Sequence, residues 1–532
     1  MHGRVKVRTT EEKERIMRAE KQKKAREFKD CYLLAMKMRK AGELDDQLAD
    51  ITKKMLYHHP DVYTLWNVRR EILLSDRLSS SGEELLEKAL EDELALTEAC
   101  LRENPKSYCV WHQREWVIER IKEPNWKKEL ALCQKCLELD ERNFHCWDYR
   151  RFVAKKAELT PQDELNFTTN KIENNFSNYS SWHYRSKLLE QLHGNRLGDA
   201  ANQQVYNNEI DLVMNATFTD PSDTSTWFYQ RWLLNYWKSP PQLWCIRLHK
   251  NFITVVFHKQ VSSSSLKLLF KDKQDDNCQW SWQSANGKMY SPTWFVDLGD
   301  LKPENLDNFI VEFEGKSYST SDEKTLPDSR DVSKLEEQLS NYKELIELEP
   351  SNKWAKLTVA QLMLDLDENS NYSSIISILE ELIQVDPLRS NYYKDMLSKC
   401  KVKHKLNSII SDPYGYDKDT AIDLSNLDLT TLGGCESYLT FCSKINLQCN
   451  LLSNEVLYQL YCLQQCKSLN LSKNNLTSLK SFPILHNLEN LVLYPNEITD
   501  FEASDILKKH AAKKLVIAGN CDEELAKNEM KK

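Results

Sequence analysis

The sequence predicts a multidomain chain: a superhelix of α-α helical hairpins, an inserted immunoglobulin-like β-sandwich and a C-terminal leucine-rich-repeat domain. Three observations support this prediction. A Trp-x2-Arg motif recurs through the N-terminal half, short alternating strand-like runs occupy residues 240–329, and a Leu/Asn pattern recurs near the C-terminus. With 532 residues, the chain is also long enough for several domains.

The helical part is predicted from the motif Pro60-x5-Trp66-x2-Arg69 and its later copies. The copies are Pro105-x5-Trp111-x2-Arg114, Trp147-x2-Arg150, Trp182-x2-Arg185, and Pro221-x5-Trp227 with Gln230 then Arg231 at the Arg position. Residues three apart share a helix face, so the Trp is expected to fill the seam between hairpins. The Arg is expected to pair with a carboxylate or stack on a ring. Paired helices are therefore predicted over residues 20–239, and weaker copies over 330–408.

Residues 240–329 interrupt this pattern. Pro240 and Pro241 end the helices, and five alternating runs follow: FITVVFH, SLKLLFK, QWSWQS, TWFVDL and FIVEFE. Short strands separated by turn residues favour a small antiparallel sandwich. Because no Cys-Trp-Cys spacing is present, the prediction is only immunoglobulin-like.

Residues 409–532 carry a second repeat, with starts at Ile422, Ile445, Leu469, Leu491 and Leu515. The starts are 22 to 24 residues apart, which is typical of leucine-rich repeats. The Leu/Ile residues are expected to point into the core from short parallel strands. Asn450, Asn474 and Asn496 are expected to satisfy turn backbone groups in the next coil.

Composition excludes several classes of protein. The net charge of −8 argues against general nucleic-acid binding. Residues 1–19 are predicted to form a charged arm, and they lack the apolar core of a secretory signal. The sequence has no run of 18 apolar residues, so no membrane span is predicted. We therefore expect a cytoplasmic protein whose 15 cysteines are reduced. Cys133-x2-Cys136 lies in a helical run without a second Cys/His pair, so helix packing is favoured over a metal or redox role.

The Trp-x2-Arg series resembles the repeats of protein prenyltransferase α subunits. Together with the sandwich, the leucine-rich tail and the opening MHGRVKV, it resembles the Rab geranylgeranyltransferase (type II) α subunits of animals. That resemblance implies a heterodimer with a geranylgeranyltransferase β subunit. The resemblance implies that this heterodimer transfers the geranylgeranyl group of geranylgeranyl diphosphate to C-terminal cysteines of Rab GTPases. A Rab escort protein would present the Rab GTPase. The resemblance also implies that zinc is bound by the β subunit and that no metal site lies in this chain.

Lys106 is the candidate catalytic residue. It follows Pro105 directly, which places a cation at the start of a predicted helix, where backbone N–H groups also favour anions. The same repeat position holds other residue types, so packing does not require a lysine there: Asp61, Arg142, Ser177 and Ser222. The resemblance implies that Lys106 contacts the diphosphate and aids its departure. The alternative is a solvated lysine at a helix start.

Tyr108, His145 and His2 are weaker candidates. The resemblance places Tyr108 and His145 near the substrate path, with contacts between repeats as the alternative for both. His112 and His183 each follow a motif Trp and are expected to pack in the core or seam. His2 is a regulatory candidate, because an imidazole on the N-terminal arm could occupy the open position of a partner's zinc. A disordered arm without this role is the alternative.

Two other functions compete with the enzyme subunit. A non-catalytic adaptor or scaffold is one, because helical and leucine-rich repeats commonly bind proteins. An RNA-processing repeat protein is the other, but the acidic balance and the lack of a basic stripe over the tryptophans count against it.

Overall fold

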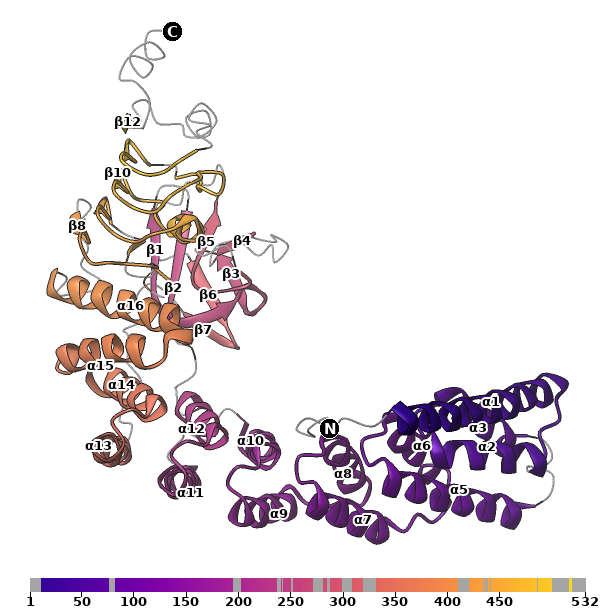
Figure 1. Cartoon of the computed structure of the whole chain (residues 1–532). Helices are drawn as coiled ribbons and strands as arrows, with labels where there is room; N and C mark the ends of the chain where they lie inside the picture. Colours follow the sequence, from indigo (N-terminus) through magenta and orange to yellow (C-terminus); the bar gives the residue numbers. More distant parts are fainter. Residues whose placement is uncertain are drawn as a thin grey trace, which may run out of the picture. The chain divides into compact units, whose positions relative to one another are not determined.

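The computed structural model describes most of the chain, in two compact units, residues 1–194 and 195–532 (Figure 1). Each unit is described by itself. The described residues are 11–75, 82–194, 202–236, 241, 243–249, 252–270, 281–284, 288–298, 309–318, 332–409, 421–433, 435, 439–440, 442–485, 487–499 and 516–518.

The first unit consists of one long helix followed by paired helices. The helices are α1 (Glu11–Ala41), α2 (Asp46–His58), α3 (Tyr63–Leu73), α5 (Glu83–Glu103), α6 (Tyr108–Ile118), α7 (Trp126–Leu139), α8 (Phe144–Lys156), α9 (Pro161–Asn174) and α10 (Tyr179–His193). The pairs are α2/α3, α5/α6, α7/α8 and α9/α10. The predicted helical repeat is confirmed. Because α1 begins at Glu11, the last part of the expected charged arm is helical.

Each motif tryptophan fixes the turn in front of its own helix. The indole N–H donates to the carbonyl oxygen six residues earlier in all five copies, at 2.8 to 2.9 Å. The side chains themselves are buried, with 5% exposure or less. A buried indole N–H requires such an acceptor, so the fixed spacing from Pro60 to Trp66 and from Pro105 to Trp111 has a physical cause.

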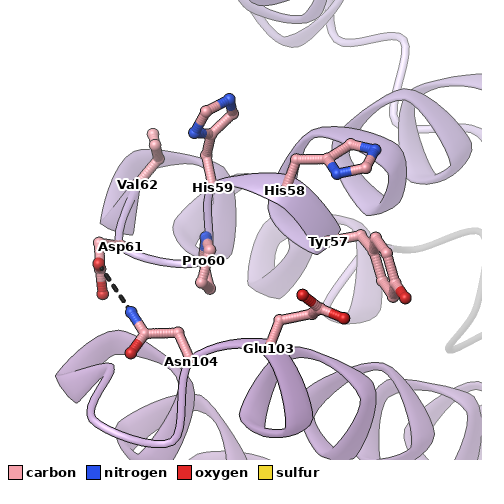
Figure 2. Close-up of a pocket in the computed structure, with 8 residues that line it drawn as sticks. All are labelled: Tyr57, His58, His59, Pro60, Asp61, Val62, Glu103 and Asn104. Atoms are coloured by element: carbon pink, nitrogen blue, oxygen red, sulfur yellow. Dashed lines mark hydrogen bonds between the residues drawn. The ribbon is translucent and has the colours of Figure 1, made fainter. Parts of the chain in front are cut away.

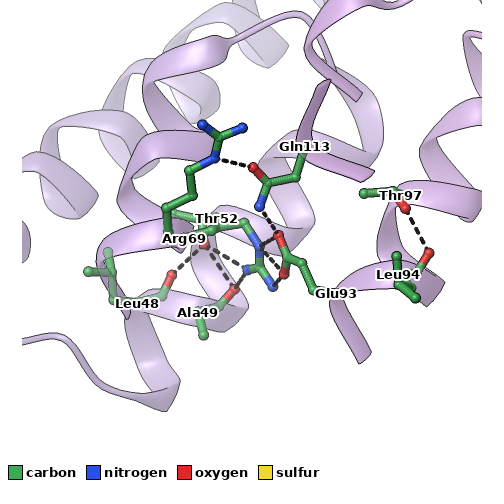
Figure 3. A network of polar contacts seen from close by, with 9 residues as sticks. Leu48, Ala49, Thr52, Arg69, Glu93, Leu94, Thr97 and Gln113 are labelled. Carbon is green, nitrogen blue, oxygen red and sulfur yellow. Dashed lines mark hydrogen bonds and ion pairs between the residues drawn. The ribbon is translucent and has the colours of Figure 1, made fainter. Parts of the chain in front are cut away.

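Each motif arginine in the first three pairs binds a glutamate in the first helix of the next pair. Arg69 binds Glu93, Arg114 binds Glu129 and Arg150 binds Glu164, each through two guanidinium nitrogens. Arg69 also donates to the Ala49 carbonyl and the Thr52 hydroxyl of α2 (Figure 3). One guanidinium thus ties together its own pair and the next. Of the two predicted partners, the carboxylate is confirmed for all three arginines, and Arg150 also lies over the Phe167 ring.

The second unit continues the helical pairs and contains both sheet regions. Its helices are α11 (Gln203–Thr219), α12 (Thr224–Tyr236), α13 (Ser333–Leu348), α14 (Lys353–Asp367), α15 (Tyr372–Val385) and α16 (Ser390–Ile409). Gln230 on α12 donates to Gln338 on α13 at 2.6 Å, and the Asn352 side chain donates to the Pro221 carbonyl at 2.8 Å. The helical stack therefore resumes directly across the inserted segment. Gln230, not Arg231, occupies the motif position.

The inserted segment forms two antiparallel sheets. Their strands are β1 (Leu243–His249), β2 (Phe252–Ser262), β3 (Leu266–Phe270), β4 (Trp282–Ser284), β5 (Tyr290–Asp297), β6 (Phe309–Phe313) and β7 (Lys316–Tyr318). One sheet has the order β1-β2-β5-β4 and the other β3-β6-β7. Phe257 and Phe313, one from each sheet, lie in a shared apolar core with their ring centroids 4.9 Å apart.

All five predicted strands of this segment are present, and two others were missed. β1 was not predicted from the sequence because Trp, Cys, Arg and His are mixed with its aliphatic residues. β7 is only three residues long, but it had a detectable signal. It follows a tight turn in which Glu314 and Gly315 both have positive φ, a conformation that favours glycine.

The C-terminal region is a ladder of five short parallel strands, as predicted. These are β8 (Ala421–Asp423), β9 (Lys444–Asn446), β10 (Ser468–Asn470), β11 (Asn490–Val492) and β12 (Val516–Ala518). Ile422, Ile445, Leu469 and Leu491 stand opposite one another in the register, which confirms the alignment of the first four repeats. Leu491 pairs with Ile517, so the start predicted at Leu515 was wrong by two residues. Val402 and Leu406 of α16 pack on the first coil and cover that end of the core.

The asparagines of this ladder bond in the direction opposite to the one expected. Asn450 accepts hydrogen bonds from the backbone N–H groups of Leu427 and Leu429 and donates to the carbonyl of Leu424. These partners belong to the preceding coil, so the prediction of bonds to the next coil was wrong. The asparagine side chain enters the coil core near the turn, where the unpaired groups of the coil before it lie within reach.

Replacing Arg114 with alanine should destabilise the first unit strongly. Arg114 and Glu129 are each about 1% exposed, so the variant would leave a buried carboxylate without its partner. We expect a loss of about 3–5 kcal/mol in the free energy of unfolding, measured by urea denaturation.

Arg39→Ala is the matched control. Its ion pair with Glu71 is about 40% exposed on both sides, so its loss should cost less than about 1 kcal/mol. Equal costs for the two variants would contradict the role assigned to the buried pair.

Candidate functional site

The candidate site lies in the turns that connect the two helices of each pair. In four of these turns an Asn or Asp side chain accepts a hydrogen bond from the backbone N–H two residues later: Asn104, Asp140, Asn175 and Asp220. This Asx turn gives neighbouring turns the same shape. The second residue after each Asx therefore recurs at one place in the repeat, and in the α5–α6 turn that residue is Lys106.

Lys106 lies before the helix rather than in its first turn. α6 begins at Tyr108 and Ser107 is its N-cap, so Lys106 precedes the cap. Its backbone N–H is bonded to the Asn104 side chain. The N–H groups of the helix itself begin at Tyr108, so the predicted contribution of the helix start to anion binding beside Lys106 stays a prediction.

The Lys106 ammonium group reaches the turn of the next pair. Its Nζ lies 2.9 Å from Oδ2 of Asp140, and the two side chains are 63% and 33% exposed. The hydrogen bond from Lys106 holds the pKa of the Asp140 carboxyl below its usual range. Because ion pairs this exposed are worth little, another anion of higher charge can replace the carboxylate at modest cost.

Aromatic side chains adjoin this ion pair. The Tyr108 ring stands edge-on to the His145 imidazole, with the two ring centroids 4.0 Å apart. The centroid of the Phe144 ring is also 4.0 Å from that of the imidazole. Tyr108 and Phe144 are more than half exposed, whereas His145 is 7% exposed. Burial lowers the pKa of His145, the Lys106 charge lowers it further, and Asp148 acts in the opposite direction. The imidazole is therefore neutral at neutral pH.

The structure thus brings Lys106, Tyr108 and His145 to two neighbouring turns. The Tyr108–His145 contact is also the contact between repeats that the alternative predicted, so the site stays a prediction. Asp140 and Phe144 complete the cluster and were missed from the sequence. Asp140 had a detectable signal, because it occupies the repeat position of Asn104 one pair later.

The remaining histidine predictions fare differently. His112 and His183 are exposed, so the expectation of core or seam packing was wrong. The residue after each motif Trp points about 100° away from the buried face of the helix. His2 lies outside the described residues.

A separate polar pocket of about 420 Å³ lies between the ends of α2 and α5 (Figure 2). Its lining is Tyr57, His58, His59, Pro60, Asp61, Val62, Glu103 and Asn104. Asp61 and Asn104 close one side through a hydrogen bond of 3.1 Å. Two carboxylates and no lysine or arginine in the lining make this pocket unsuited to a diphosphate.

Neither a metal site nor a membrane-spanning helix is found in the described part of the chain. No three His, Cys, Asp or Glu side chains there are grouped as ligands of one metal ion. None of the described helices is both long and apolar enough to cross a bilayer.

Comparison with known proteins identifies the repeat. Five segments match the family described as "Protein prenyltransferase alpha subunit repeat": residues 45–76, 90–121, 126–157, 161–192 and 206–237. The "Geranylgeranyl transferase type-2 subunit alpha" of Homo sapiens is 37% identical, with 94% of this chain and 92% of the human protein covered. The chain belongs to the type-2 geranylgeranyltransferase alpha subunit family. The Mus musculus member is also 37% identical, over 95% of this chain and 93% of its own length.

A more distant member of the family is shorter. The Candida albicans type-2 alpha subunit is 32% identical, and the match covers 78% of that protein but only 47% of this chain. Among solved structures, "Candida albicans protein geranylgeranyltransferase-I complexed with GGPP" aligns with 70% of this chain and 91% of its own, at 17% identity and a TM-score of 0.44. That similarity is too low to bear on the fold or the site.

The pKa of His145 should lie below the ordinary histidine value of about 6.5. Its contribution to stability is then present above the unfolded-state pKa and is lost as the pH falls through the folded-state value. NMR titration of the imidazole would measure the pKa. Lys106→Gln should raise it, because that variant removes a nearby positive charge.

Lys122→Gln is the control for this titration. Lys122 forms an exposed ion pair with Glu83 and is not among the charges that act on His145, so the pKa should not move. A His145 pKa at or above 6.5 in the unmodified chain would contradict the assigned burial.

Proposed function

We propose that this chain is the α subunit of a heterodimeric protein geranylgeranyltransferase type II. The complex transfers the geranylgeranyl group of geranylgeranyl diphosphate to C-terminal cysteines of Rab GTPases that an escort protein presents. Family membership supports the reaction class. The observation that carries the assignment to this chain is an exposed lysine beside Tyr108, Phe144 and His145 at the turns of two adjacent pairs.

In this proposal Lys106 stabilises the leaving group. The cysteine sulfur attacks the lipid carbon that carries the diphosphate, the carbon–oxygen bond breaks, and diphosphate leaves with the bonding electrons. Negative charge grows on the diphosphate oxygens as that bond breaks, and an ammonium group nearby stabilises the transition state more than the ground state. Lys106 exchanges its Asp140 partner for a diphosphate oxygen. Asp140 thereby holds the ammonium group in place between turnovers.

Tyr108 and His145 are proposed to border the substrate path. The neutral imidazole adds no charge that would compete with Lys106, and its buried ring supports the exposed Tyr108 ring. An exposed phenol with a fixed ring position can contact either the lipid diphosphate or the peptide.

The partner β subunit is proposed to dock on an aromatic row. This row consists of the first residue of four helices, each 49% to 67% exposed: Tyr63, Tyr108, Phe144 and Tyr179. Large aromatic side chains repeated on one unit are typical of an interface that is covered by a partner.

Zinc is proposed to belong to that partner. The described residues of this chain hold no group of three side chains suited to bind one metal ion, so they do not fit a zinc site. Thiolate formation is therefore assigned to the β subunit, and no step of this chain's chemistry is derived through the metal.

The chain is proposed to have five parts: a charged arm (1–19), helical repeats (20–239), an immunoglobulin-like insert (240–329), the final helices (330–408) and a leucine-rich-repeat domain (409–532). The Gln230–Gln338 bond across the insert supports the division of the helical part. The two sheets with a shared core support the immunoglobulin-like insert, and the asparagine ladder supports the leucine-rich-repeat domain. The short Candida albicans relative indicates that transfer itself needs less than this whole chain.

Lys106→Ala should slow lipid transfer by the reconstituted heterodimer by on the order of 10-fold to 100-fold in kcat. The test is co-expression with a candidate β subunit, followed by single-turnover transfer of geranylgeranyl to a Rab–escort complex. Thermal stability should change little, because the Lys106–Asp140 pair is exposed.

Lys122→Ala supplies a matched exposed lysine in an ion pair and should leave transfer unchanged. Full activity of the Lys106 variant would remove Lys106 from the mechanism. Failure of any β subunit to co-purify would favour an adaptor instead.

Deletion of residues 1–8 should raise turnover or lower KM in the same assay. The reason is the proposal that His2 on the arm occupies the partner's open zinc position and limits access to the site. His2→Ala should reproduce the effect if the imidazole is responsible. Unchanged kinetics in both proteins would dismiss a regulatory arm.

A further inference from the structure

The α7–α8 hairpin brings three cysteine thiols together. Cys133 and Cys136 lie one turn apart on α7, and Cys146 lies in the first turn of α8. The Cys146 thiol donates to the Cys133 carbonyl at 3.5 Å, one turn before Cys136, and interactions with the Cys133 and Cys136 thiols raise its pKa. The C-x-x-C pair of the sequence thus acquires a third thiol from the neighbouring helix.

The three thiols differ in access to solvent. Cys133 and Cys146 have no exposed surface, whereas Cys136 is only partly buried. Cys136 is therefore the thiol of the group that a small molecule can reach from solution.

They also differ in acidity. The hydrogen bond from Cys146 lowers the pKa of Cys136, despite partial burial. Hydrogen bonds to Cys133 and Cys136, together with burial, raise the pKa of Cys146. The more accessible sulfur is thus also the more readily ionised one, and the thiolate is the form that attacks a disulfide.

Metal binding is not the chemistry that this cluster supports. The described residues contain no group of three ligands placed around one metal position, and that includes these thiols. Exchange with a disulfide requires only two sulfurs that can meet, one of them reachable from solution.

We propose that Cys136 and Cys146 form a reversible disulfide across the α7–α8 hairpin when the chain meets a small disulfide oxidant such as oxidised glutathione. The Cys136 thiolate attacks one sulfur of the oxidant, a mixed disulfide forms, and one glutathione thiolate leaves. Cys146 then loses its proton and attacks the Cys136 sulfur, releasing the second glutathione. Two protein thiols are oxidised, and one oxidant disulfide is reduced to two thiols.

Cys146 is the expected second partner rather than Cys133. A bond between Cys133 and Cys136 would join two positions within one regular helix, whereas Cys146 comes from the helix packed against it. The closed loop would contain Asp140 and His145, so oxidation would constrain the turn that carries part of the proposed site. The disulfide itself does not depend on the proposed function.

The test is oxidation of the folded full chain with oxidised glutathione, followed by alkylation of remaining thiols and peptide mapping by mass spectrometry. A Cys31→Ser background removes an exposed thiol that would add a separate mixed disulfide. We expect a cross-linked peptide pair joining Cys136 to Cys146, with both lost from the alkylated pool and restored by dithiothreitol.

Three variants sharpen this test. Cys146→Ala should arrest the reaction, leaving one glutathione on Cys136, and Cys136→Ser should abolish it at this hairpin. Cys133→Ser should still form the Cys136–Cys146 bond. Because mapping of the parent chain requires no buried substitution, misfolding of a variant does not decide the outcome. An unreacted Cys136, a Cys133–Cys136 bond, or a persistent glutathione adduct on Cys136 in the parent would overturn the proposal.

Discussion

The buried arginine–glutamate pair is the constraint on which the helical part depends. A guanidinium group without solvent must find a carboxylate, and in this chain the carboxylate comes from the next helical pair. Adjacent pairs are therefore coupled, and the position of each is determined by the one before it. Carbonyl and hydroxyl groups of the preceding helix satisfy other guanidinium hydrogens, as the Arg69 network shows.

The same constraint explains how the helical stack accommodates an insertion. At the break the charged pair is replaced by two neutral amides, Gln230 and Gln338, which bond to each other. A neutral pair needs no compensating charge in the core, so the partner can come from a distant segment without risk of an unpaired buried ion. The stack therefore continues although a sheet region separates the two helices in sequence.

The candidate site arises from residues that differ between otherwise equivalent turns. The tryptophan bond and the Asx turn give each turn one shape, and the coupled pairs place consecutive turns side by side. A lysine in one turn and an aspartate in the next can then meet, as Lys106 and Asp140 do. Exposed aromatic residues recur at the adjacent helix starts, so the lysine stands among rings at this edge of the unit.

The sequence by itself determined the repeating frame of this protein. Trp66, Trp111 and their equivalents predicted the helical pairs, and the Leu/Asn spacing predicted the register of the first four strands of the parallel ladder, because burial and backbone hydrogen bonding recur with a fixed period. Lys106 could be singled out because packing did not require a lysine there. Strands of mixed composition, such as β1, have no repeating pattern of apolar residues and were not predicted.

The tertiary structure alone decided which residues meet across repeats. The pairing of Lys106 with Asp140, the direction of the asparagine bonds and the hydrogen bond from Cys146 to the Cys133 carbonyl depend on how one turn or helix lies against its neighbour. That relation follows from the packing of whole side chains between elements, and no local pattern of residue types contains it.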